Sequence, residues 1–187
     1  MAIKVYIDQG HNPQNPNAGA EGNGYREQDI VYRIGQELYN LLYEDPNYIP
    51  RLSRPTPQTQ LGNSVSSSLI ERVEQANSFG ANLFLSLHTN ASTNPNVSGT
   101  EALVFRNGSV AYDIANILLR QISLITGLRN RGIVLRPRLY VLRRTRMPAV
   151  LLELGFITNP DDAELMYNNP RLFALAIYRG LNEYYGF

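Results

Sequence analysis

The sequence contains no cysteine and no tryptophan, and only two of its 187 residues are histidine. Without cysteine the chain forms no disulfide and no thiolate metal site, so a metal ion would need nitrogen and oxygen ligands. No run of about 18 apolar residues occurs, and the sequence therefore predicts no membrane-spanning helix. With 17 Lys and Arg against 16 Asp and Glu, the formal charge of +1 argues against a dedicated nucleic-acid-binding protein.

The length and the even composition predict one domain. A chain of 187 residues can bury a sizeable core, and we find no internal repeat, linker or low-complexity segment, so we expect a single domain over 1–187. The opening stretch "MAIKVYID" resembles a strand and carries neither the apolar core nor the cleavage site of a signal peptide. We therefore expect that the protein stays inside the cell or that its export depends on something outside this chain.

Apolar runs alternate with helical patterns along the chain, which is typical of an α/β domain. The runs "LFLSL" and "AVLLEL" are apolar on both faces and predict central strands of a mostly parallel sheet with helices on both faces. We expect strands at 3–8, 82–88, 100–106, 138–143 and 149–155. We expect helices from about residue 26 and at 68–80, 109–127, 161–167 and 170–187. Asp161 is the expected N-cap of the fourth helix.

The segment 10–25 is rich in glycine, asparagine and proline and predicts a long loop, which in a compact domain is usually functional. Its stretch "GAEGNG" is similar to a phosphate-cradling loop but lacks the Lys-Ser/Thr of a P-loop and the G-x-G-x-x-G order. A nucleotide-binding domain is therefore the weaker alternative. A serine hydrolase is disfavoured, because no G-x-S-x-G motif occurs and Ser86 lies inside an expected strand.

Four titratable residues are expected to meet at one edge of the sheet. His11 follows the first strand, His88 ends the second, and Glu153 lies near the end of the last. The carboxyl ends of parallel strands share one edge, where ligands of open α/β sheets bind. Glu27 precedes Ile30 by three residues and so shares the inward face of the first helix.

These residues can be interpreted as a zinc site. An inward carboxylate is costly unless it is paired, and two imidazoles with one carboxylate are a common zinc ligand set that leaves one position open. Glu153 could then act as a general base towards water and return the proton to a leaving amine. Each residue also has an ordinary interpretation. The histidines could be hydrogen-bonded structural residues, Glu27 a first-turn acid favoured by the helix dipole, and Glu153 the partner of one of seven arginines in 129–146.

Six motifs follow one another along nearly the whole chain. They are "IDQGHN" at 7–12, "GYREQD" at 24–29, "ERVEQAN" with "LSLHTNAS" at 71–77 and 85–92, "SGTEALVF" at 98–105, "NRGIV" at 130–134, and "MPAVLLELGFITN" at 147–159. In order and spacing they resemble the zinc-dependent N-acetylmuramoyl-L-alanine amidases of the Amidase_3 type. Gln9 and Asn12 stand where that family usually has proline and glycine.

The resemblance implies that His11, Glu27 and His88 bind Zn²⁺ and that Glu153 is the catalytic carboxylate. It implies cleavage of the amide between the lactyl group of N-acetylmuramic acid and L-alanine, with peptidoglycan as the partner. The site of action would be the cell wall, reached by phage-type release or as one domain of a longer exported protein with its own wall-binding module. A non-catalytic peptidoglycan-binding module of the same fold is the alternative.

Substrate recognition would rest mainly on the peptide. Without tryptophan the chain lacks the usual platform for stacking on sugars, although twelve tyrosines could serve instead. One or two of the seven arginines in 129–146 would bind carboxylates of the peptide stem, because the guanidinium fork suits a carboxylate. The remaining arginines are expected to form a solvated rim.

Overall fold

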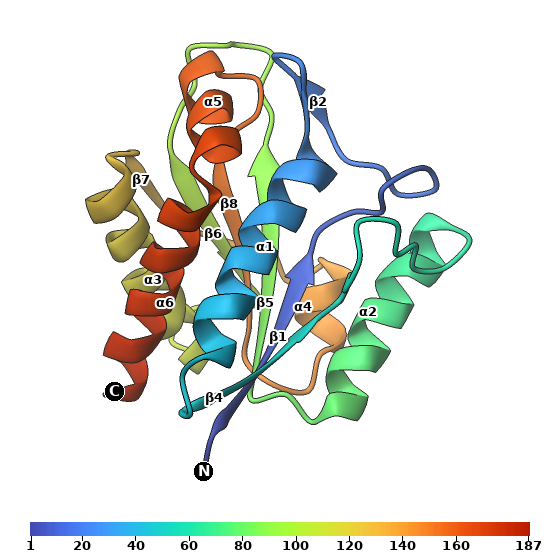
Figure 1. Ribbon diagram of the computed structural model, residues 1–187, viewed down its shortest axis with the longest axis vertical. Coiled ribbons are helices and arrows are strands. Elements are labelled where there is room, and N and C mark those ends of the chain that lie inside the picture. The colour runs from blue at the N-terminus through green and yellow to red at the C-terminus, as the bar shows by residue number, and fades with distance from the viewer.

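A six-stranded sheet in the order β4-β1-β5-β8-β6-β7 forms the centre of the molecule (Figure 1). The computed structural model describes all residues from 1 to 187. The strands of this sheet are β1 (Ile3–Gln9), β4 (Tyr48–Leu52), β5 (Leu83–Asn90), β6 (Thr100–Val104), β7 (Asn130–Leu135) and β8 (Ala149–Phe156). The first three and β8 run parallel, whereas β6 pairs antiparallel with β8 and parallel with β7. The predicted mostly parallel sheet is confirmed.

Helices cover both faces of the sheet unequally. The helices are α1 (Glu27–Tyr43), α2 (Val65–Phe79), α3 (Val110–Thr126), α4 (Tyr140–Arg144), α5 (Pro160–Asn168) and α6 (Pro170–Tyr185). Helices α1, α3 and α6 pack over one face around the larger apolar core, and α2 and the short α4 cover the other over a smaller one (Figure 1). None of these helices combines the length and apolarity needed to cross a bilayer.

The expected loop at 10–25 contains a small hairpin of β2 (Glu21–Gly22) and β3 (Tyr25–Arg26). Asn23 and Gly24 connect its strands, and both have positive φ angles, of 52° and 80°. This is the Asn-Gly turn that suits the twist of a two-residue hairpin. The "GAEGNG" stretch is therefore used to reverse the chain, and α1 begins directly after the hairpin.

Two local predictions are wrong. Residues 138–143 were expected to form a strand, but the chain forms α4, whose Val141 and Leu142 are both buried. Strand β7 forms the edge of the sheet beside β6. The segment 138–143, which follows β7, therefore adds no further strand and packs over one face of the sheet instead. The N-cap of α5 is Asn159, whose side chain accepts a hydrogen bond from the Asp162 N–H. Pro160 occupies the first helical position, where proline is favoured, so the helix begins before Asp161.

Candidate metal centre and active site

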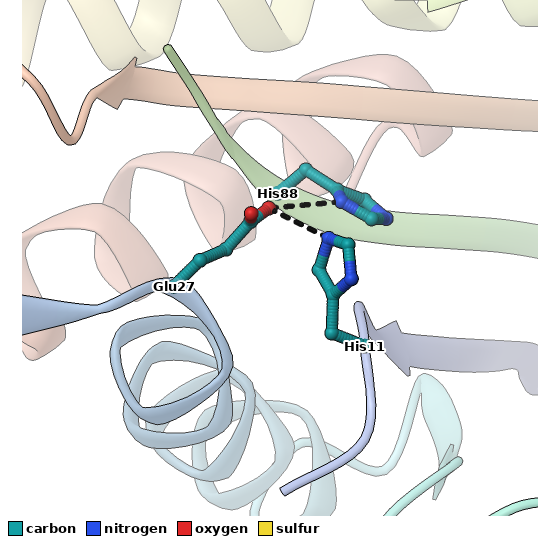
Figure 2. Close-up of side chains that lie close together, drawn as sticks. All are labelled: His11, Glu27 and His88. Carbon is teal, nitrogen blue, oxygen red and sulfur yellow. Dashed lines mark hydrogen bonds and ion pairs between the residues drawn. The ribbon is translucent and has the colours of Figure 1, made fainter. Parts of the chain in front are cut away.

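Three of the four predicted site residues come together at the carboxyl ends of the parallel strands. His11 follows β1, Glu27 is the first residue of α1, and His88 lies near the end of β5. Glu27 Oε1 lies 3.1 Å from His11 Nε2 and 3.0 Å from His88 Nδ1. Figure 2 shows the three side chains pointing toward one another from three separate elements. The ligand atoms they offer all lie within 4.8 Å of one another.

Two glycines leave the space in which these side chains meet. A Cβ atom on Gly10 would lie 2.5 Å from Cε1 of the His88 ring. A Cβ atom on Gly19 would lie 2.9 Å from Glu27 Oε2 and 3.0 Å from His11 Cδ2. The close approach of ring, carboxylate and backbone therefore requires glycine at both positions.

A buried arginine holds the backbone that carries His11. The Arg72 guanidinium, 1% exposed, donates to Asp8 Oδ1 at 2.5 Å, to the Gln9 carbonyl at 2.8 Å and to the His11 carbonyl at 2.5 Å. Burial raises the pKa of Asp8, but the Arg72 charge and a hydrogen bond from Ser86 outweigh it and hold that pKa below its usual range. His11 has a φ of 65°, an uncommon conformation for a residue other than glycine. Arg72 holds this conformation through its hydrogen bonds to the carbonyls of Gln9 and His11.

The two departures from the family motif contribute to the same loop. The Asn12 amide donates to the carbonyls of Pro16 and Leu61, both at 2.9 Å, and its oxygen accepts from the Leu61 N–H at 3.1 Å. Gln9 is fully buried, and its side-chain oxygen accepts from the Arg54 N–H at 2.9 Å. Both side chains thus tie the loop after β1 to the segment around 54–61.

Glu27 is held as a carboxylate. Its Oε1 accepts from the Thr89 N–H at 2.9 Å and its Oε2 from the Ala20 N–H at 3.0 Å. Burial raises the pKa of Glu27, but hydrogen bonds to His11 and His88 outweigh it and place that pKa far below its usual range. Burial lowers the pKa of His88, yet the bond to Glu27 and the negative charge of that carboxylate leave it raised overall.

The residues present fit a divalent metal ion. Two ring nitrogens and one carboxylate oxygen converge, without sulfur, and such a donor set suits zinc. The second carboxylate oxygen is fixed by a backbone N–H, as expected for a ligand that is held in place by its surroundings. The His11 Nδ1 atom is buried without a hydrogen-bond partner.

Glu153 lies on β8 directly beside His88 in the register of the sheet. Its Oε2 atom is buried and has no hydrogen-bond partner. Burial raises the pKa of Glu153 to about 7, against the opposing effect of His88 and with a further increase from Glu27 and Glu101. No arginine pairs with Glu153, so the structural ion pair considered from the sequence is not formed.

Sequence reasoning missed two charged residues that support the site. Glu101 of β6 faces Glu153 across the antiparallel pair and accepts a 2.7 Å hydrogen bond from Arg131 Nε. Arg72, described above, is the other. Glu101 lies in "SGTEALVF", where a charged residue beside an apolar run was an available signal, whereas Arg72 lies in the polar stretch "ERVEQAN", which offered none. Asn77, by contrast, bonds to the backbone of Arg144 and Arg146, where it anchors the end of α4.

Comparison with known proteins places the chain in a family. The family model described as N-acetylmuramoyl-L-alanine amidase, Amidase_3, matches residues 5–183. The chain is 34% identical over 180 residues to the N-acetylmuramoyl-L-alanine amidase CwlM of Bacillus licheniformis, and 34% identical over 187 residues to LytC of Bacillus subtilis. These alignments cover 95% and 97% of the chain. The chain therefore belongs to the N-acetylmuramoyl-L-alanine amidase family, as its motifs predicted.

Solved structures show the same fold. The catalytic domain of CwlV, an N-acetylmuramoyl-L-alanine amidase from Paenibacillus polymyxa, superposes with a TM-score of 0.85 at 31% identity and with 98% of each chain covered. An N-acetylmuramoyl-L-alanine amidase from Clostridium difficile 630 gives a TM-score of 0.86 at 29% identity, with 99% of this chain and 97% of that chain covered. The chain spans 65% of the length of CwlM and 35% of that of LytC.

Proposed function

We propose that this chain is a catalytic domain that hydrolyses the amide between the lactyl group of N-acetylmuramic acid and L-alanine in peptidoglycan. Family membership supports the substrate, and the relatives CwlM and LytC are both named as N-acetylmuramoyl-L-alanine amidases. The observation that carries the proposal is the convergence of His11, Glu27 and His88, with Glu153 beside them on the next strand. The whole of 1–187 forms this one domain in the proposal.

We propose Zn²⁺ as the ion held by His11, Glu27 and His88. When bound, zinc would supply a Lewis acid that polarises the scissile carbonyl and lowers the pKa of water. The N–H groups of Thr89 and Ala20 donate to the Glu27 carboxylate, which keeps it ionised and fixes its orientation before the metal binds. The left-handed backbone at His11 and the missing side chain at Gly10 bring both imidazoles to the same point.

Glu153 would carry the protons of the reaction. A general base works best when its pKa lies near the working pH, and burial raises the pKa of this carboxyl to about 7. With one oxygen buried and free of hydrogen bonds, the carboxyl has capacity to accept a proton from attacking water. Returning that proton to the departing L-alanine nitrogen completes hydrolysis and restores the carboxylate.

The cell wall is the proposed place of action. Relatives of the chain include the endolysin of Bacillus phage SPP1, at 32% identity, and amidases of Bacillus subtilis named as sporulation-specific and germination-specific, at 28% and 27%. These relatives include both phage and cellular proteins. Their common target in the proposal is the cell wall. A wall-binding module on a longer form of this protein would be compatible with the greater lengths of CwlM and LytC.

The test is cleavage of a purified muropeptide, followed by mass spectrometry for release of a peptide with L-alanine at its new amino terminus. We expect wild-type activity to vanish on chelation and to return with zinc. Glu153→Gln should keep the fold and bound zinc while turnover falls by roughly 10²–10⁴-fold. Glu164→Gln, at an exposed position on α5, is the matched control and should behave as wild type.

Two results would contradict the proposal. Metal-free protein that cleaves the muropeptide at the full rate would remove the metal from the reaction. Zinc-loaded protein that binds wall fragments without cutting them would favour the non-catalytic module instead.

A further inference from the structure

We propose that the peptide stem of the substrate leaves the metal centre between α2 and the segment 136–139, where Arg136 and Arg138 bind its carboxylates. The inference rests on the proposed function and names the part of the chain that selects the peptide. Helix α2 and α4, which follows this segment, lie on the same face of the sheet (Figure 1).

A small apolar cavity begins beside the two histidines. It has a volume of about 110 Å³, and His11 and His88 form part of its wall. Leu69 of α2 and Leu139 contribute apolar side chains to it, together with Leu151 of β8. The cavity therefore offers room for a small apolar group next to the proposed ligands.

A second and more open cavity shares part of its wall with the first. Its volume is about 570 Å³, and its wall includes Arg136 and Arg138. Leu69 and Leu139 line both cavities, so the two cavities are neighbours that meet at this leucine pair. A chain extending from the metal centre past Leu69 and Leu139 would therefore reach the two arginines.

The two arginines are available to a ligand. Both side chains are exposed, and neither takes part in an ion pair, whereas Arg131 nearby in sequence is bound to Glu101. Their backbone is fixed, because the Arg136 N–H donates to the Val104 carbonyl at 2.8 Å and the Leu139 N–H to the Arg136 carbonyl at 3.1 Å. Guanidinium groups on a fixed turn, without an ion-pair partner in the protein, suit carboxylate recognition.

Together the two cavities, called the groove below, match a peptide whose first side chain is small and whose later groups are anionic. A small side chain would occupy the 110 Å³ cavity, and a carboxylate further along would meet Arg136 or Arg138. The chain should therefore prefer stems with free carboxylates over stems in which these groups are amidated.

The test compares binding and cleavage in the full chain. The probes are a synthetic L-alanyl stem peptide with free carboxylates, the same peptide amidated, and the two muropeptides that carry them. Calorimetry measures binding of each peptide to wild type, to Arg136→Gln with Arg138→Gln, and to Arg143→Gln. Arg143 is the matched control, because it is also exposed but lines a different cavity, with Phe105 and Met147.

We expect the double variant to bind the free-carboxylate peptide about tenfold more weakly and to show a correspondingly higher KM with kcat unchanged. The amidated peptide should bind wild type and double variant equally, and Arg143→Gln should match wild type throughout. Equal binding of the free-carboxylate peptide by wild type and double variant, or no binding at all, overturns the inference. Arginine-dependent binding without any cleavage would support the groove and contradict the proposed amidase activity.

Discussion

At the scale of single residues, Glu153 and Arg72 differ in how their charges are compensated: Glu153 has an unpartnered oxygen, whereas Arg72 is paired on all sides that the structure shows. Glu153 is half-buried beside His88 and its Oε2 atom is buried without a partner, so its charged form is disfavoured. Arg72 is buried more deeply but pairs with Asp8 and with two backbone carbonyls. A group kept unpaired in a site is suited to moving protons, and a fully paired group is suited to holding a backbone in place.

We expect Glu153→Gln to stabilise the metal-free protein at high pH only. Because the pKa of Glu153 is raised from 4.5 to about 7 on folding, stability falls as the pH rises through this interval. The penalty reaches about 3 kcal/mol above pH 7 and is absent below pH 4.5. Urea unfolding with a chelator at pH 4 and pH 8 measures it. An equal effect of the substitution at both pH values would show that burial does not disfavour the charged carboxylate.

Arg72→Met should lower both stability and metal affinity. Removing one partner of a buried ion pair leaves Asp8 uncompensated, which costs roughly 3–5 kcal/mol, and frees the His11 carbonyl. Denaturant unfolding and zinc competition with a chromophoric chelator measure the two effects. Arg54→Met is the control, because Arg54 is equally buried but bonds to the carbonyls of Gln28 and Pro57. Equal losses of zinc affinity in both variants would argue against a role of Arg72 in placing His11.

At the scale of elements, the sequence predicted what long patterns encode. The apolar runs of β1, β5 and β8 identified the central strands, and their ends located His11, His88 and Glu153. Edge strands β4 and β7 escaped prediction because Pro50 and Gly132 interrupt short, partly exposed runs. Helix α4 has five residues, too few for a helical period to be told from alternation.

The support of the site was less predictable than its centre. The phase of Ile30 on α1 indicated that Glu27 faces inward, and the structure confirms its burial. Nothing local to "ERVEQAN" shows that Arg72 reaches the loop after β1, because that contact depends on how α2 packs against the sheet. A side chain that bonds to the backbone of a sequence-distant segment produces no hydrophobic pattern by which it could be predicted.

Close packing between β1 and β5 predicts that Gly10→Ala disrupts the metal centre. The new Cβ would lie 2.5 Å from the His88 ring and 2.6 Å from the Leu87 carbonyl, so the ring must move. We expect zinc affinity to fall at least tenfold, measured by competition titration, because a ligand is displaced. Gly80→Ala is the control: its positive φ costs roughly 1–2 kcal/mol, yet its Cβ meets open space far from the ligands. Unchanged zinc affinity in Gly10→Ala would show that His88 does not bind the metal.

At the scale of the whole molecule, the proposed ligands join three elements that are distant in sequence. The loop after β1, the start of α1 and the end of β5 each supply one side chain. The unfolded chain cannot hold them together, so metal binding should add to the stability of the fold.

Zinc should raise the free energy of unfolding by about 4 kcal/mol at a free concentration 1,000 times the Kd. The gain should shrink as the pH falls, because the raised pKa of His88 makes a proton compete with the metal at a higher pH than it would at an ordinary imidazole. Below the pKa of a ligand, the apparent affinity for zinc falls about tenfold for each unit by which the pH drops, for every proton that the metal must displace. Thermal unfolding with and without zinc at pH 5.5, 6.5 and 7.5 measures this. A gain independent of pH, or its persistence in His88→Ala, would place the metal elsewhere.

The reversed direction of β6 and β7 has a consequence for which connections border this site. His11, His88 and Glu153 lie at or near the carboxyl ends of parallel strands and Glu27 begins α1, whereas Glu101 and Arg131 lie near the beginnings of β6 and β7, which run opposite to β8. Two sets of connections therefore border the same site: the segment between β1 and α1, which carries His11 and leads to Glu27, and the segments that lead into β6 and β7. The second set, around 91–99 and 127–129, contains none of the proposed ligands. The strand reversal thus lets a second set of connections reach the edge of the site without carrying any of its proposed ligands.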